Sequence, residues 1–197
     1  TNDQTHTLVY ADTTQGWKIV NQDTVASIQP SFTSATGGTV TESGDYKIHT
    51  FTGDGCFVVS TLGNSPVSPA GGPSTASYLV IAGGAGGGGA ANNWSGGGGG
   101  GAGGYREGRD ITPSYTASPL VAPAGLTISA QTYPITVGGG GTKGAFGGGR
   151  GCSGSNSIFS TITSAGGGGG GSKTCNNASL YSLAGGSGGG GVADNGS

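Results

Sequence analysis

The chain has 197 residues, of which 48 are glycine, 32% are hydrophobic and 8% are charged, and its formal net charge is -2 at pH 7. This length suits one domain with at most a small appendage. The few Lys and Arg residues are scattered, so the basic surface that nucleic-acid binding requires is missing and we expect no nucleic-acid partner.

The N-terminal residues 1–37 predict a small β segment. The stretch "THTLVYAD" alternates in hydrophobicity, "QGWKIV" follows after a turn, and "VASI" is a third short apolar run. Trp17 is expected to pack within this segment or to form an oligomer contact. The polar stretch "SFTSATGG" predicts a linker to a second domain, which we expect to span residues 38–197.

A β-hairpin is predicted from Tyr46 to Thr61. Two runs of alternating hydrophobicity flank Gly53-Asp54-Gly55 in "GDYKIHTFTGDGCFVVSTLG". Glycine and aspartate at this spacing are typical of a tight hairpin turn.

From Tyr78 onward a unit recurs in which a short β-prone run leads into a glycine tract. The unit occurs as "YLVIAGGAGGGG", "YPITVGGGG", "FSTITSAGGGGGG" and, less strictly, "LYSLAGGSGGGG". Tracts at 96–104 and 147–151 lack the leading strand. The sequence therefore contains an internal repeat without a fixed period.

Three interpretations of the glycine tracts compete. Flexible linkers join segments that fold alone, but the segments between these tracts are mostly too short to do so. A dinucleotide site needs a helix after its glycines, and "GGGAANNWSGGGGGG" cannot form one because each interior glycine costs about 1 kcal/mol relative to alanine. We therefore favour an ordered bundle of polyglycine helices in the polyproline II form, with three residues per turn.

The expected fold is mostly β and irregular, with short strands and a hairpin packed with polyglycine II helices and little or no α-helix. With three residues per turn, positions i and i+3 share a face. A helix surrounded on all sides must be pure glycine, so 96–101 and 166–171 are predicted to be interior. Tracts with a row of small side chains are predicted at edges; these rows are Ala82, Ala85 and Ala91; Ala102 and Tyr105; and Ala184, Ser187 and Ala193.

No residue pattern points to catalysis. His6 and His49 lie far apart and outside metal or catalytic spacings, and turns or solvated faces account for the acidic pairs. Cys56, Cys152 and Cys175 match neither a zinc site nor a redox pair, so we interpret them as small buried or loop residues, with one Cys152–Cys175 bridge as the alternative. We expect no enzyme activity, no metal and no cofactor.

The ordered set of motifs resembles a known family. "DYKIHTFTGDGCFVV", "YLVIAGGAGGGG", "GGGGAGGYREG", "ITVGGGG" and "SNSIFSTITSAGGGGGG" are similar to the glycine-rich domain of bacteriophage tail-fibre adhesins and other virion structural proteins. The resemblance implies a virion (extracellular) protein whose N-terminal segment serves attachment or oligomerisation. The partners it implies are other virion proteins and a polysaccharide or outer-membrane protein of the host surface, with a homotrimer as one possible assembly.

In such adhesins the tracts are scaffold and the inserts between them contact the host. Here the inserts are residues 90–95, 142–146, 150–157 and 172–184, and the long insert 105–137 departs from the adhesin pattern. The receptor-binding candidates are Asn92, Asn93, Trp94, Lys143, Phe146, Arg150, Lys173, Asn176, Asn177 and Tyr181. Trp94 and Tyr181 are the leading residues because large aromatics offer rigid contact area, although Trp94 could instead cap the bundle.

Two functions of other classes are alternatives. The chain could be a self-assembling extracellular structural protein in which the glycine forms the filament itself. It could also be an ice-binding module, although the strict G-X-X repeats expected of one are missing from the sequence.

Overall fold

The computed structural model describes residues 8–14, 16–19, 30–64, 71–91, 96–109, 118, 121–173 and 179–192. Every element in these ranges is a short β-strand or an extended segment, and the absence of α-helix among the described residues agrees with the predicted fold class. No described helix could therefore cross a membrane.

The N-terminal hairpin consists of β1 (Leu8–Asp12) and β2 (Gly16–Ile19), which pair antiparallel. Tyr10 faces Trp17 across the two strands, with the ring centroids 5.4 Å apart in an edge-to-face arrangement. The side chain of Trp17 is 70% exposed. The predicted third run, "VASI", and His6 lie outside the described residues.

The main sheet has five strands in the order β13-β12-β11-β6-β3. Their bounds are β3 (Ser34–Thr36), β6 (Gly55–Thr61), β11 (Thr132–Thr136), β12 (Ser157–Phe159) and β13 (Ile162–Ser164). Every pair in it is antiparallel. The stretch predicted to be a linker contains β3, which pairs with β6 and so belongs to the sheet.

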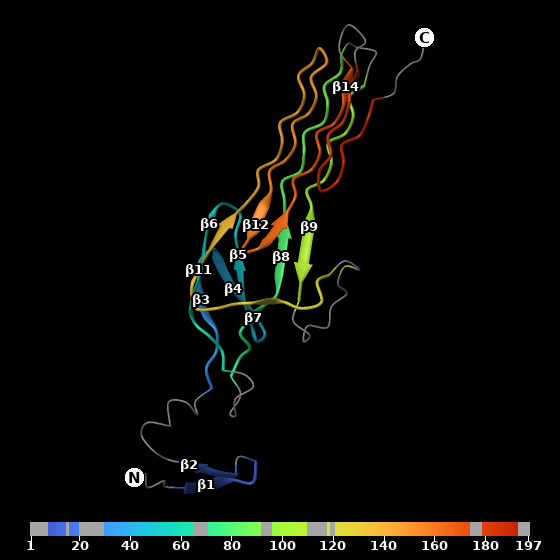
Figure 1. Cartoon of the computed structure of the whole chain (residues 1–197). Coiled ribbons are helices and arrows are strands. Elements are labelled where there is room, and N and C mark those ends of the chain that lie inside the picture. The colour runs from blue at the N-terminus through green and yellow to red at the C-terminus, as the bar shows by residue number, and fades with distance from the viewer. Residues whose placement is uncertain are drawn as a thin grey trace, which may run out of the picture.

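Pairs of strands complete the β part of the chain. They are β4 (Thr39–Ser43) with β5 (Tyr46–Thr50), β7 (Thr75–Ala76) with β10 (Leu126–Thr127), β8 (Tyr78–Ile81) with β9 (Tyr105–Gly108), and β14 (Ser172–Lys173) with β15 (Ser179–Leu180). The first three lie around the main sheet, whereas β14 lies at the far end of the molecule (Figure 1).

The predicted hairpin from Tyr46 to Thr61 is wrong in its pairing, although both of its strands exist. β5 pairs with β4 across the turn at Gly44 and Asp45, whereas β6 pairs with β11 and β3. Gly44 has a φ of 56°, which suits a tight two-residue turn. Asp54 instead accepts a hydrogen bond from the amide of Val137, at 2.8 Å.

Aromatic rings fill the core of the β part. Phe57, Tyr133 and Phe159 form a cluster with centroid separations of 6.3, 6.0 and 5.9 Å. Val59 and Ile128 are buried with them. The ring of His49 packs edge-to-face on Phe57 at 5.0 Å, so this histidine supports the core.

The glycine tracts extend from the strands as a bundle of parallel and antiparallel extended segments (Figure 1). We number them tract 1 to tract 7; their residues are 82–90, 96–104, 138–146, 149–156, 165–171, 181–185 and 187–191. β8, β11 and β13 lead directly into tracts 1, 3 and 5, and tracts 2 and 4 return directly into β9 and β12. The predicted repeat of strand and tract is therefore the architecture of the chain.

Hydrogen bonds between tracts recur every third residue. The amides of Ala82, Ala85 and Gly88 donate to tract 2 at 2.8–3.0 Å, and those of Gly83, Gly86 and Gly89 donate to tract 4 at 2.7–3.1 Å. No glycine of the seven tracts has a positive φ, whereas Gly147 and Gly148, in the turn between tracts 3 and 4, do. Three residues per turn with negative φ define the left-handed polyglycine II helix.

Tract 5 is the centre of the bundle, as predicted. Its glycines 166–171 are all buried, and its backbone is hydrogen-bonded to tracts 1, 2, 4, 6 and 7. A Cβ atom added at Gly166, Gly167 or Gly168 would lie 2.0, 2.1 or 1.9 Å from a carbonyl oxygen of tract 4, 2 or 6 respectively. Successive residues of tract 5 thus face different neighbouring tracts, and none of these positions has room for a side chain.

The prediction that 96–101 is interior is wrong. Gly96, Gly97, Gly99 and Gly100 are exposed, and a Cβ at Gly96 or Gly99 would meet nothing within 4 Å. In this tract two of every three residues face a neighbouring tract, so a residue with a side chain fits at the third position. Ala102 and Tyr105 continue that outward row and are exposed, as predicted.

The edge prediction holds for the last tracts and fails for the first. Ala184 and Ser187 are exposed, whereas Ala82 and Ala91 are only 7% and 5% exposed. In tract 1 the side chains of this row face tract 5, since a Cβ at Gly88, in the same row, would lie 1.8 Å from the carbonyl oxygen of Gly171. Ala193 lies outside the described residues.

Candidate binding surface at the far end of the bundle

Tracts 1, 3 and 5 run from the strands to the end of the bundle remote from the main sheet, and the turn between tracts 3 and 4 lies there (Figure 1). The hydrogen-bond register shows that the tract ends are level, since Gly88 pairs with Gly98, Gly98 with Gly171, and Gly171 with Gly190. We call this region the tip. The long insert, residues 105–137, contains β10 and β11, which pair with β7 and β6 at the opposite end.

Two aromatic side chains of the tip are among the most exposed in the described chain. Phe146 stands just before the turn from tract 3 to tract 4, at 72% exposure, and Tyr181 follows β15, at 81%. Gly147 and Gly148 make the turn with φ near 100°, a conformation that side chains other than glycine rarely adopt. The backbone of this turn therefore fixes where Phe146 leaves the bundle.

The pair β14–β15 is anchored to the bundle by a buried serine. Ser172 is fully buried, and its hydroxyl donates to the carbonyl of Gly89, at 2.6 Å. Lys173 follows it, paired with Ser179 in the register of the two strands. The lysine and Tyr181 are thus held at the tip by hydrogen bonds of the strand pair.

The predicted site residues share one end of the molecule without sharing one face. Lys143 and Phe146 lie on tract 3, beside tract 1, whereas Tyr181 begins tract 6, on the far side of tract 5. Arg150 is exposed on tract 4. Five other candidates lie outside the described residues, namely Asn92, Asn93, Trp94, Asn176 and Asn177.

Part of the predicted loop set belongs to the scaffold instead. Residues 151–155 donate and accept bundle hydrogen bonds, for example from Gly86 to the carbonyl of Cys152 at 3.0 Å, so they form tract 4. Asn156 and Ser157 stabilise the tract starts, since they accept from the amides of Gly166 and Gly138 at 2.9 Å each. Cys56 and Cys152 are exposed free thiols, which contradicts a buried role for them; Cys175 lies outside the described residues.

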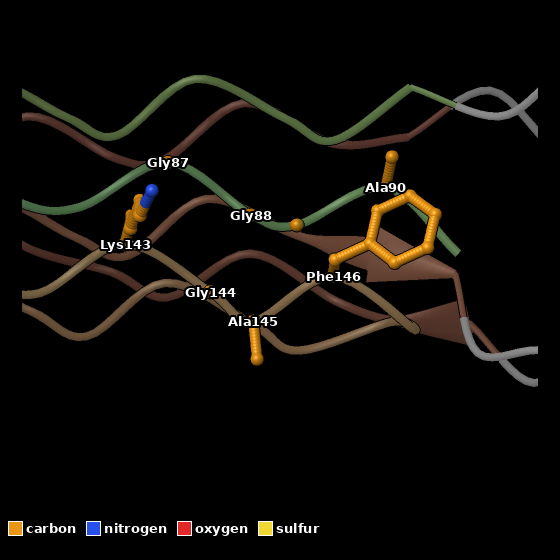
Figure 2. A pocket seen from close by; sticks show the side chains of 8 residues that line it. Gly87, Gly88, Ala90, Lys143, Gly144, Ala145 and Phe146 are labelled. Carbon is orange, nitrogen blue, oxygen red and sulfur yellow. The ribbon is translucent and has the colours of Figure 1, made fainter. Parts of the chain in front are cut away.

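An open groove runs along the bundle just below the tip, between tracts 1 and 3. It has a volume of about 550 Å³ and is lined by residues 87–90 and 143–146. Figure 2 shows the side chains of Lys143 and Phe146 lying toward tract 1, while Ala145 points away. The two side chains are three residues apart, so they stand on one row about 9 Å apart along the helix.

A second hollow, of about 530 Å³, lies at the base of the bundle near Tyr105, Arg106 and Ser118. Beside it, the carboxylate of Glu107, only 7% exposed, accepts hydrogen bonds from the Tyr105 hydroxyl at 3.2 Å and the Ser118 amide at 3.1 Å. Partial burial, and then the hydrogen bond and charge of Glu107, raise the pKa of Tyr105. The sequence did not predict this hollow because the residues that line it come from segments far apart in the chain.

The described residues contain no cluster of three His, Cys, Asp or Glu side chains that could hold a metal ion. The arrangement is suited to binding through exposed side chains, because a rigid glycine scaffold holds aromatic and cationic residues at one end.

The fold is that of an all-β protein built around a polyglycine II bundle. Residues 59–197 match the family described as the glycine-rich domain, and the chain belongs to this family. Comparisons with curated proteins and with solved structures found no match.

Proposed function

We propose that the protein is a phage virion structural protein of tail-fibre or appendage type, and that its tip binds the host cell surface. The observation that carries the proposal is that two highly exposed aromatic side chains, Phe146 and Tyr181, both lie at the tip, the end of the bundle remote from the main sheet. The sequence resemblance to virion glycine-rich domains supports it.

The composition of the tip suits a polysaccharide or an outer-membrane protein loop. Aromatic rings supply rigid apolar area, and Lys143, Arg150 and Lys173 surround them with cations that can meet anionic groups. The N-terminal hairpin, with Tyr10 and Trp17 exposed, is the proposed contact to other virion proteins or to further copies of the chain. We propose no catalytic activity.

The double variant Phe146→Ala and Tyr181→Ala tests the host-binding role. Fluorescently labelled protein is incubated with a panel of Gram-negative strains, and bound fluorescence is measured per cell. On a strain that binds the wild type, we expect the double variant to bind at least tenfold more weakly, because exposed aromatic anchors dominate such interfaces. Its thermal midpoint should stay unchanged, since both side chains are exposed.

The matched control is Tyr46→Ala, which removes a half-exposed aromatic side chain from β5 in the opposite half of the molecule. It should bind like the wild type. If the folded double variant binds as well as Tyr46→Ala, the tip is not the receptor-binding surface.

A further inference from the structure

Tract 1 has one row of amide donors that the bundle does not use. Two rows donate to tracts 2 and 4, as described above. The amides of the third row, Gly84 and Gly87, donate no hydrogen bond within the described part of the chain. Because rows of a three-fold helix lie about 120° apart, these amides point away from both acceptor tracts.

The carbonyls of tract 1 face its neighbouring tracts. Those of Gly83 and Gly86 accept from tract 5, and those of Gly84, Gly87 and Ala90 accept from tract 3. The remaining row, Ala85 and Gly88, accepts no hydrogen bond from the described residues. These two carbonyls lie against tract 2 instead, since a Cβ at Gly100 or Gly97 would lie 2.2 or 1.9 Å from their oxygens. The amide row of Gly84 and Gly87 is therefore the unused one.

The unused amide row falls on the open side of tract 1. Hydrogen bonds place its neighbours in the order tract 2, tract 5, tract 4, tract 3, because each of these is also bonded to the next. The remaining arc, from tract 3 back to tract 2, is open. The groove lined by residues 87–90 and 143–146 lies on this arc (Figure 2).

The open side also has room that the packed sides lack. A Cβ at Gly84 or Gly87 would lie 3.9 or 3.3 Å from the nearest carbonyl oxygen, that of Gly101 or Gly98, whereas one at Gly83 would lie 2.0 Å from that of Gly139. Lys143 lines the groove, is exposed and forms no ion pair with the residues that the structure describes.

We infer that this groove binds an extended segment of a partner protein in the polyproline II conformation, glycine-rich and acidic. The segment would add to tract 1 as another helix of the bundle, much as a peptide adds a strand to the edge of a sheet. Its carbonyls would accept from the amides of Gly84 and Gly87, just as carbonyls of tracts 2 and 4 accept from the other two amide rows of tract 1.

The neighbours already present specify the chemistry of the occupant. In tracts 2 and 4, every third residue faces tract 1, and each of these residues is glycine. A Cβ there would lie 1.9–2.2 Å from a carbonyl oxygen of tract 1; the positions are 97, 100 and 103 in tract 2 and 151 and 154 in tract 4. An occupant at the same spacing needs glycine at every third residue, and acidic residues near Lys143 would complement its charge. This inference is independent of host binding by the tip.

The test uses the full chain and a fluorescent dodecapeptide, (Gly-Gly-Glu)4, followed by fluorescence anisotropy. The wild type should bind it at least tenfold more tightly than (Ala-Ala-Glu)4, whose Cβ atoms block close approach, or (Gly-Gly-Lys)4, which carries the wrong charge. Absence of measurable binding of (Gly-Gly-Glu)4 at millimolar concentration would overturn the inference.

The decisive variant is Gly84→Pro. Proline fits the φ of a polyproline II helix, and this amide donates no bond within the described residues, so the bundle should remain folded. The ring replaces the free N–H on the open side of tract 1, one turn before the groove. Affinity for (Gly-Gly-Glu)4 should fall at least tenfold. The matched control is Gly139→Pro on tract 3, where the amide is also unused and a Cβ meets nothing within 4 Å; it should bind within twofold of the wild type.

Lys143→Glu provides a second variant that leaves the backbone unchanged and should also weaken binding at least tenfold. Equal affinity of the wild type and a folded Gly84→Pro would refute the groove as the binding site. Self-association of the wild type in sedimentation that Gly84→Pro abolishes would assign the groove to a second copy of the chain, and would equally overturn the inference.

Discussion

Gly168 shows why single residues of the bundle must be glycine. A Cβ at this position would lie 1.9 Å from the carbonyl oxygen of Leu183 and 2.7 Å from its carbonyl carbon. The φ of Gly168 is not positive, so the requirement comes from space alone. The glycines of tract 5 are therefore needed because the backbones pack directly against each other.

Gly168→Ala and Gly99→Ala make a matched pair for this explanation. The first should lower the free energy of unfolding by about 1–3 kcal/mol or more, as overpacking does. The second should raise it by about 0.4–1 kcal/mol, because a Cβ there meets nothing within 4 Å and alanine restricts the unfolded chain. Urea unfolding followed by circular dichroism measures both; equal effects of the two substitutions would contradict the assigned packing.

At the scale of one element, tract 1 illustrates how a polyglycine helix is held. Two of every three amides donate to neighbouring tracts, and the third does not. An α-helix bonds within itself, whereas here each bond joins segments far apart in the sequence. The element is consequently stable only while its neighbours are in place.

Amide exchange should reveal this period directly. By NMR, we expect the amides of residues 82, 83, 85, 86, 88 and 89 to exchange at least tenfold more slowly than those of Gly84 and Gly87 in the same helix, because only the former donate hydrogen bonds. Uniform exchange along 82–89 would exclude the three-fold helix. The amides of Gly167, Gly168, Gly170 and Gly171 in the buried tract 5 provide the slow reference.

At the scale of the whole molecule, the β part and the bundle share one continuous backbone. β8, β9, β11, β12 and β13 each pass directly into a tract, with Ser157 and Asn156 bonding the first amides beyond the strands. The aromatic core lies in the β part, and the tract backbones have no core of side chains. We expect neither half to persist without the other.

A single unfolding transition follows from this continuity. Near-ultraviolet circular dichroism reports the packed rings of Phe57, Tyr133 and Phe159, while far-ultraviolet circular dichroism reports the backbone of both parts. The two signals should change with the same thermal midpoint, and Gly168→Ala should lower both midpoints equally. Separate midpoints, or a shift of the far-ultraviolet signal alone, would show that the bundle unfolds independently.

The sequence by itself determined the kind of structure, because glycine tracts follow short β-prone runs in a repeating pattern. That pattern predicted the polyglycine II bundle, the absence of α-helix in the described chain and the burial of 166–171, where the pure glycine composition leaves no side chain to expose.

Only the tertiary structure decided which segments are neighbours. The strands around Gly53 were predicted as a hairpin, yet β5 and β6 pair elsewhere, because hydrogen bonds between distant segments leave no local signal. For the same reason 96–101 looked interior, and the groove beside Gly84 and Gly87 was invisible. A glycine tract has the same composition whether other tracts surround it or leave one side open, because the difference lies entirely in its neighbours.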